Sequence, residues 1–251
     1  MWSGLARSGV GYTAEVSTVP ASPPLLESLS AVKPYLRGWL HLGIVPVTLV
    51  GGIVLIAMSS SPVSRIGSTV FVLSALLLFG VSAAYHRGTW SPSTWRVLRR
   101  LDHCNIFVLI AGSCTAYALV LLDVRDAAPM LAMVWASALI GVAARFVWSD
   151  APRWLSPPIY VGCAWGALLY SPHLVRGASR LGDLGPVTLA LLGVGALLYV
   201  GGGIVYGFQR PDPWPRWFGF HEVFHALTVL AFAAHFTGIL LAAVALRAAA
   251  S

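Results

Sequence analysis

The feature that most constrains this chain is a series of seven long stretches that contain no Asp, Glu, Lys or Arg. Each has at least about 18 residues, and a helix needs roughly 20 to cross the hydrocarbon core of a bilayer. Because no water is available there to satisfy backbone groups, each stretch should be helical. The stretches run from Gly38 to Ser64, Ile66 to His86, His103 to Leu122, Ala127 to Ala144, Leu155 to Val175, Leu184 to Gln209 and Val223 to Leu246. The sequence therefore predicts an all-α, polytopic bundle of seven transmembrane helices.

Composition excludes a water-soluble protein. Hydrophobic residues make up 57% of the 251 positions and charged residues only 10%, whereas a soluble domain has about 25% charged residues. The net charge of +7 does not indicate a nucleic-acid partner, because the basic residues lie in short groups between the apolar stretches. That placement is typical of membrane topology and of contacts with anionic lipid.

The basic residues also predict which way the helices run. If the N-terminus and alternate loops share one side, eleven of the sixteen Lys and Arg residues lie on that side. The positive-inside bias then places the N-terminus in the cytosol and the C-terminus outside, in a multi-pass protein of the plasma (inner) membrane. Those eleven are Arg7, Lys33, Arg37, Arg87, Arg96, Arg99, Arg100, Arg145, Arg153, Arg210 and Arg216, and the other five are Arg65, Arg125, Arg176, Arg180 and Arg247.

The chain divides into two predicted parts. Residues 1–33 are rich in Ser, Pro and Gly and are expected to form a disordered cytosolic tail, and residues 34–251 form the transmembrane domain. Three cysteines, Cys104, Cys114 and Cys163, fall inside apolar stretches. Their number is odd and their spacing does not match a zinc ribbon, so free, buried thiols are expected.

Five ionisable residues are predicted to gather at one end of the bundle. With alternating directions, the starts of the first, third and seventh spans and the end of the second lie at the same depth. Ionisable groups at membrane depth are costly and are functional candidates. The five are His41, His86, Asp102, His221 and His225.

The spacing of these residues indicates a metal or proton site. His221 and His225 lie four positions apart, on one helix face and about 6 Å apart in rise. Three neutral imidazoles are a sufficient protein ligand set for Zn²⁺, and a nearby carboxylate such as Asp102 can act as a base or hydrogen-bond a ligating histidine. Separately, the same residues also fit simpler roles: interfacial histidines, an N-cap or helix-dipole role for Asp102, and a packing hydroxyl for Ser82 on the face of His86.

Several short motifs occur in an order that resembles the hemolysin III family, the bacterial branch related to the adiponectin and progestin membrane receptors. The wider superfamily has a Ser-x-x-x-His pair, an Asp at the third span and a His-x-x-x-His pair. The matching segments here are Lys33 to His41, Ser82 to His86, Leu101 to His103, Gly202 to Tyr206 and His221 to His225. One departure is Phe224, where a tryptophan is common in the family.

The resemblance implies a specific metal site. It implies Zn²⁺ held by positions that match His86, His221 and His225, with Asp102 holding a water molecule at the metal and Ser82 close by. The superfamily includes alkaline ceramidases, so the implied chemistry is hydrolysis of a lipid amide. The implied partner is a membrane lipid, such as a ceramide-like or other acyl-amide substrate.

Three functions follow as hypotheses. The first is a zinc-dependent lipid hydrolase involved in membrane-lipid homeostasis. The second is a non-enzymatic sensor or regulator of membrane state, in which the zinc is structural. The third is a haemolysin or pore-former, which the family name suggests but which a chain committed to the bilayer by seven spans does not favour. The sequence does not specify the oligomeric state.

Overall fold

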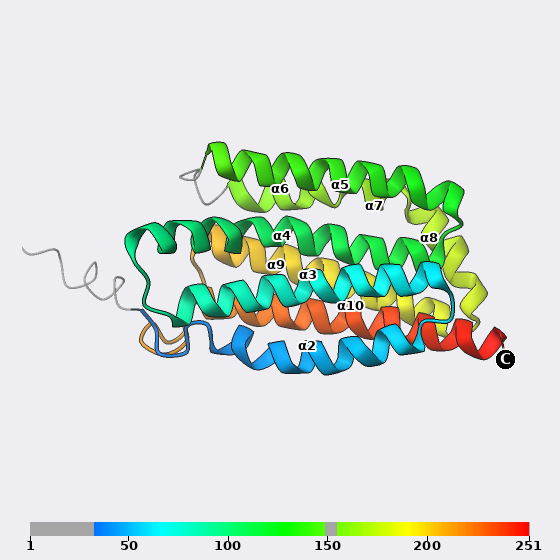
Figure 1. Ribbon diagram of the computed structural model, residues 1–251, viewed down its shortest axis with the longest axis horizontal. Coiled ribbons are helices and arrows are strands. Elements are labelled where there is room, and N and C mark those ends of the chain that lie inside the picture. Colours follow the sequence, from blue (N-terminus) through cyan, green and yellow to red (C-terminus); the bar gives the residue numbers. More distant parts are fainter. Residues whose placement is uncertain (1–32, 149–154, 251) are drawn as a thin grey trace, which may run out of the picture. The chain divides into compact units, whose positions relative to one another are not determined.

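The computed structural model describes residues 33–148 and 155–250, and its regular secondary structure is helical throughout these two ranges (Figure 1). Residues 1–32, which contain most of the predicted disordered tail, lie outside the described residues. The helices are α2 (Trp39–Met58), α3 (Pro62–Arg87), α4 (Pro92–Leu121), α5 (Val124–Val147), α6 (Ser156–Cys163), α7 (Trp165–Leu169), α8 (Ser171–Ala178), the 3₁₀ helix η2 (Ser179–Leu181), α9 (Leu184–Phe208) and α10 (Phe220–Ala250).

Six of the described helices are long and apolar enough to cross a membrane: α2, α3, α4, α5, α9 and α10. They have 20 to 30 residues each within the spans, which satisfies the length that the hydrocarbon core requires. Helices α2, α5 and α9 leave much of their apolar surface outside the protein interior. That surface needs lipid around it, so the prediction of a multi-pass membrane protein is confirmed.

The fifth predicted stretch, Leu155 to Val175, does not form one continuous helix. It is divided among the short helices α6, α7 and α8. Pro172 in the first turn of α8 lacks a backbone N–H, and its ring would clash with the carbonyl of Leu168 if α7 continued. The chain therefore turns between α7 and α8. The predicted count of seven uninterrupted spans is not confirmed.

The boundary between the first two spans lies earlier than the charge pattern indicated. Helix α2 ends at Met58, and Ser61 caps α3 through a reciprocal pair of hydrogen bonds with Ser64. This capping box satisfies orphan N–H groups at the helix start. Arg65, which separated the two apolar stretches in the sequence, consequently lies within the first turns of α3. Its Nε donates to the carbonyl of Ser59 at 3.0 Å.

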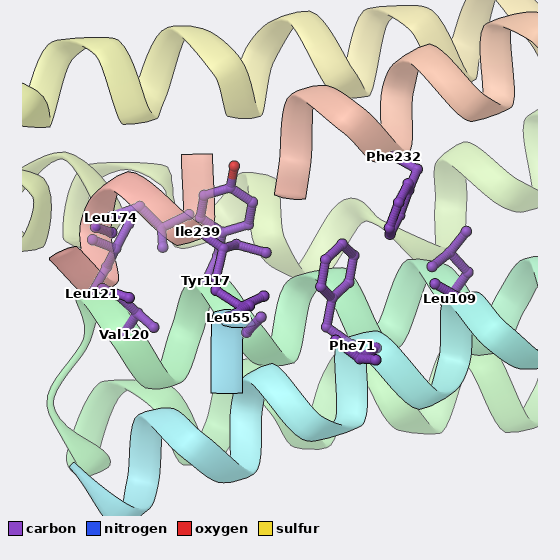
Figure 2. Close-up of a cluster of buried hydrophobic side chains, with 14 of the residues drawn as sticks. Leu55, Phe71, Leu109, Tyr117, Val120, Leu121, Leu174, Phe232 and Ile239 are labelled. Carbon is purple, nitrogen blue, oxygen red and sulfur yellow. The ribbon is translucent and has the colours of Figure 1, made fainter. Parts of the chain in front are cut away.

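Helices α3, α4 and α10 supply most of the side chains in the main buried hydrophobic cluster. Helix α10 contacts α2, α4 and α9, and α3 packs along α4. Between them lies a cluster of buried side chains in which Phe71 of α3 stacks on Phe232 of α10, with ring centroids 5.3 Å apart (Figure 2). Tyr117 of α4 and Ile239 of α10 are buried in the same cluster. This packing fixes the positions of α3, α4 and α10 relative to one another.

The prediction for the cysteines is confirmed. All three thiols are free, Cys104 and Cys163 are buried, and Cys114 is partly buried.

Candidate metal centre

The site lies where the end of α3, an early part of α4 and the start of α10 meet. His86 stands one residue before the end of α3, Asp102 lies within α4, and His221 and His225 belong to the first turns of α10. The residues that were predicted to share one end of the bundle are therefore brought together by three helices that contact one another.

Three histidines form the centre of this site. One ring nitrogen from each of His86, His221 and His225 lies within 4.8 Å of the others. The Nε2 atoms of His86 and His221 are 3.2 Å apart. The spacing of four residues places His221 and His225 on the same face of α10, and their ring centroids are 4.5 Å apart. The three rings therefore present nitrogen atoms to one small volume.

Asp102 and Ser82 adjoin the three-histidine cluster. The Oδ2 atom of Asp102 lies 3.9 Å from the Nε2 atom of His86. Ser82 is buried one helical turn before His86, and it lines the same cavity as Asp102. The two residues that were predicted to assist the metal site thus lie beside the cluster, Ser82 on α3 and Asp102 on α4.

The first turn of α10 is held by two carboxylates. Asp212 accepts a hydrogen bond from the backbone N–H of Phe220 at 2.8 Å, and Glu222 accepts one from the N–H of Gly219 at 2.8 Å. The N–H groups at a helix start have no partner within the helix, so these contacts define where α10 begins. They also fix the backbone that carries His221.

Glu222 has a second partner from the opposite end of the sequence. Its Oε1 atom accepts a hydrogen bond from the Nε of Arg37, which lies just before α2. The backbone N–H of Tyr35 also donates to the carbonyl of Arg216 at 3.0 Å, and that of Leu36 to Trp217 at 3.2 Å. The segment before α2 is therefore attached to the segment before α10 through both backbone and side chains.

Gly38 connects this segment to the end of α3. It adopts φ +82°, which favours glycine, and an added Cβ would lie 2.8 Å from the Cβ of His86. Beside it, the Arg87 guanidinium lies 4.1 Å above the ring of Trp39, a cation–π contact. This close approach seats the start of α2 directly against His86.

His41 is the fifth residue predicted at this end of the bundle. It contacts the three-histidine cluster but is not one of its members. Its ring stacks on His225, with centroids 3.8 Å apart and an interplanar angle of 10°. The side chain is buried, with 2% of its surface exposed.

A cavity of about 60 Å³ extends from this cluster into the bundle. Its polar lining includes His41, Ser82, Asp102 and His225, and farther along Tyr199 and Thr228. The remaining wall is mostly apolar and includes Leu78, Ile106, Leu109, Ile110 and Phe224. The cavity can hold a small polar group next to the cluster, with apolar side chains around the rest of a ligand.

The three remaining histidines, all in the described part of the chain, lie elsewhere, and the Nε2 atom of His173 is 3.9 Å from the Oδ2 atom of Asp126. His103 points to α9, where its Nε2 lies 3.3 Å from the Tyr206 hydroxyl. His235 hydrogen-bonds the carbonyl of Leu192 at 3.1 Å.

Sequence reasoning missed Glu222 as a residue that supports the site. Arg37 and Glu222 lie within the matching segments Lys33 to His41 and His221 to His225, but neither was assigned a role. One signal for Glu222 was available, because it is the sole carboxylate in an otherwise uncharged stretch from Gly219 to Leu246 and a buried carboxylate needs a partner. The identity of that partner depends on tertiary contacts.

Comparisons with known proteins identify the family. A family model described as Haemolysin-III related matches residues 29–236, and the chain belongs to this family. The chain is 30% identical over 142 residues to the Hemolysin-3 homolog of Bacillus subtilis (strain 168), an alignment that covers 57% of this chain and 63% of that protein. It is 23% identical over 239 residues to the Adiponectin receptor protein of Drosophila melanogaster, covering 86% of this chain and 54% of that protein. The chain thus spans less than two thirds of the length of either relative. The predicted resemblance is confirmed.

Proposed function

We propose that this Haemolysin-III related protein is a zinc-dependent hydrolase of lipid amides in the plasma membrane. The observation that carries the proposal is the convergence of His86, His221 and His225, with Asp102 and the cavity beside them. In this proposal the N-terminus lies in the cytosol and the α6–α8 segment completes a seventh span. The charge asymmetry of the loops supports that orientation.

The three-histidine cluster fits a zinc ion. Two nitrogen ligands at about 2.0–2.1 Å from one tetrahedral ion lie about 3.3 Å from each other, and the Nε2 atoms of His86 and His221 are 3.2 Å apart. The Nδ1 atom of His225 is buried and has no hydrogen-bond partner in the described part of the chain. Imidazole is a ligand that zinc prefers. His86, His221 and His225 would hold the ion.

The residues beside the cluster fit the roles that hydrolysis requires. A bound zinc ion supplies Lewis-acid chemistry to a carbonyl group and to water. The Asp102 carboxylate, 3.9 Å from His86, is placed to accept a proton at Oδ2 from a water molecule in the cavity and to return it to the leaving amine. Ser82 lines the same cavity as Asp102 and would offer its hydroxyl to that carboxylate or to a bound polar group. The apolar wall of the cavity would exclude bulk water and contact a hydrocarbon chain.

A membrane-state sensor with a structural zinc is the second candidate. One ligand comes from α3 and two from α10, so a metal held there would join two helices whether or not it takes part in a reaction. The test must therefore measure metal content as well as turnover.

The test combines metal content with turnover in detergent-purified protein. Wild type is expected to carry about one zinc per chain and to hydrolyse short-chain ceramides or related acyl amides, whereas His86→Ala and His221→Ala lose the metal. Asp102→Asn should keep the metal and lose turnover. His235→Ala, which removes a buried histidine outside the cluster, is the control. Zinc retention without turnover on a broad lipid panel would favour the sensor, and absence of zinc from wild type would exclude both candidates.

A further inference from the structure

His41 is buried in the protein without a hydrogen-bond partner. Its side chain has 2% of its surface exposed, and among the described residues neither Nδ1 nor Nε2 is hydrogen-bonded. A buried polar group without a partner costs free energy. Buried polar atoms in native proteins almost always have a partner, which can be water or a ligand. The ring of His41 therefore needs a partner that the described part of the chain does not supply.

The surroundings of His41 hold its ring in one orientation. One face stacks on His225 at 3.8 Å and 10°, and the ring of Phe79 packs against it at a centroid distance of 5.1 Å and 60°. Rotation of the ring out of this position would break the stack. Packing therefore sets the direction in which the two ring nitrogens of His41 point.

The cavity offers space for the missing partner. His41 lines it together with Ser82, Asp102 and His225. Its volume of about 60 Å³ exceeds the roughly 10–15 Å³ that one water molecule needs. A carbonyl or hydroxyl group next to the three-histidine cluster would thus fit within reach of His41.

Thr48 shows that burial alone does not place a residue at this cavity. It also belongs to α2, is 1% exposed, and has a hydroxyl without a partner among the described residues. It is absent from the lining of the cavity, whereas His41 is part of it. A substitution of His41 therefore tests a contact with a ligand in the cavity. A substitution of Thr48 tests only the loss of a buried, unpaired polar group on α2.

We propose that His41 is a ligand-binding residue that hydrogen-bonds the amide group of an acyl-amide lipid in this cavity. The identity of the lipid rests on the proposed function, and the contact itself rests on the cavity and on the unpartnered ring. A neutral imidazole offers one N–H donor and one nitrogen acceptor. It therefore suits an uncharged amide or hydroxyl, which needs both kinds of partner. His41 holds the substrate, and the three-histidine cluster and Asp102 act on it.

The experiment measures binding separately from turnover. Wild type, His41→Phe and Thr48→Val, each in lipid nanodiscs, are titrated with two fluorescent probes: a short-chain ceramide, and an analogue in which –CO–NH– is replaced by –CH₂–CH₂–. Phenylalanine keeps an aromatic ring to stack on His225 and removes both nitrogens. Zinc content and thermal unfolding are measured on the same samples.

The expected result is specific to one variant and one probe. His41→Phe should bind the ceramide probe about tenfold more weakly than wild type, bind the analogue as wild type does, and retain its zinc. Thr48→Val should match wild type with both probes. Equal weakening for both probes would mean a packing effect and would overturn the proposal, as would loss of zinc in His41→Phe or unchanged ceramide affinity.

The outcomes distinguish this proposal from the proposed function. A selective loss of ceramide binding in His41→Phe, with no turnover by wild type on any lipid, would support the contact and contradict the hydrolase. Turnover by wild type, together with unchanged ceramide binding in His41→Phe, would support the hydrolase and contradict the contact. If His41→Phe does not fold, wild type alone still tests the contact, since equal affinity for the two probes overturns it.

Discussion

Arg37 and Glu222 form an ion pair that joins the segment before α2 to the first turn of α10, across 185 positions of the chain. Glu222 is almost completely buried, and Arg37 is mostly buried. Because Glu222 also accepts a hydrogen bond from Gly219 at 2.8 Å, a single carboxylate fixes both the start of α10 and the approach to α2. His221 follows Gly219 by two residues and His41 follows Arg37 by four, so the ion pair positions residues on both sides of the site.

Breaking this pair should destabilise the protein strongly. Glu222→Gln leaves the Arg37 guanidinium partly buried without a counter-charge, and removal of one partner of a buried pair costs about 3–5 kcal/mol of unfolding free energy. Thermal unfolding in detergent measures the loss. The control is Asp123→Asn, which removes the partner of Arg180 from an exposed pair and should change stability by no more than about 1 kcal/mol. Equal effects of the two substitutions would contradict the importance of the Arg37–Glu222 pair.

Removal of metal should lower the stability of the wild-type protein. If a zinc ion bridges α3 and α10, it binds the folded state and adds about 2.7 kcal/mol when its free concentration is a hundred times the Kd. A chelator is therefore expected to lower the melting temperature of wild type and to leave that of His225→Ala unchanged. A melting temperature for wild type that does not respond to chelator or to added zinc would argue against a metal at this position.

Substitution of Gly38 should weaken metal binding although Gly38 is not a ligand. Gly38→Ala forces a side chain into the left-handed region, at about 1 kcal/mol or more, and places a Cβ 2.8 Å from the Cβ of His86. His86 must shift, and zinc affinity is expected to fall about tenfold, as it does when a partner that orients a ligand is lost. Competition with a chromophoric chelator measures this affinity.

Gly43→Ala is the matched control for Gly38→Ala. Gly43 also lies near the start of α2, but an added Cβ there meets nothing within 4 Å. Its zinc affinity should equal that of wild type. If both variants bind zinc equally well, the contact between Gly38 and His86 does not position the ligand.

Gly195 should tolerate no side chain because of His235. An added Cβ would lie 2.2 Å from Cδ2 and 2.4 Å from Nε2 of that ring, and Nε2 bonds the carbonyl of Leu192. Gly195→Ala should therefore cost about 1–3 kcal/mol of stability through overpacking, with zinc content unchanged. Gly193→Ala, two residues earlier on α9 and with nothing within 4 Å, should not lower the melting temperature. Destabilisation by both variants would point to helix flexibility and not to the His235 contact.

Hydropathy and charge predicted most of the architecture because the bilayer imposes one local requirement. A segment in hydrocarbon must be apolar and must satisfy its backbone internally, so long uncharged stretches predict helices. Where the prediction failed, a local signal opposed the hydropathy. Pro172 interrupts the fifth stretch, and the cap at Ser61 places Arg65 within α3, although its charge appeared to mark the loop. Hydropathy contains no information about either effect.

The candidate site was only partly predictable. Alternating helix directions place His86, Asp102, His221 and His225 at one end of the bundle, and the spacing of four residues places His221 and His225 on one face. No sequence rule pairs Arg37 with Glu222, because they lie 185 positions apart and their contact depends on how two loops pack.

The sequence by itself therefore determined that the chain crosses a membrane as helices and that His86, His221 and His225 lie at one end of the bundle. Both follow from one-dimensional patterns of charge and spacing. The tertiary structure decided which of those residues meet, because lateral contacts between helices depend on packing and close approach. It placed His86 within reach of His221, stacked His41 on His225, and paired Glu222 with Arg37.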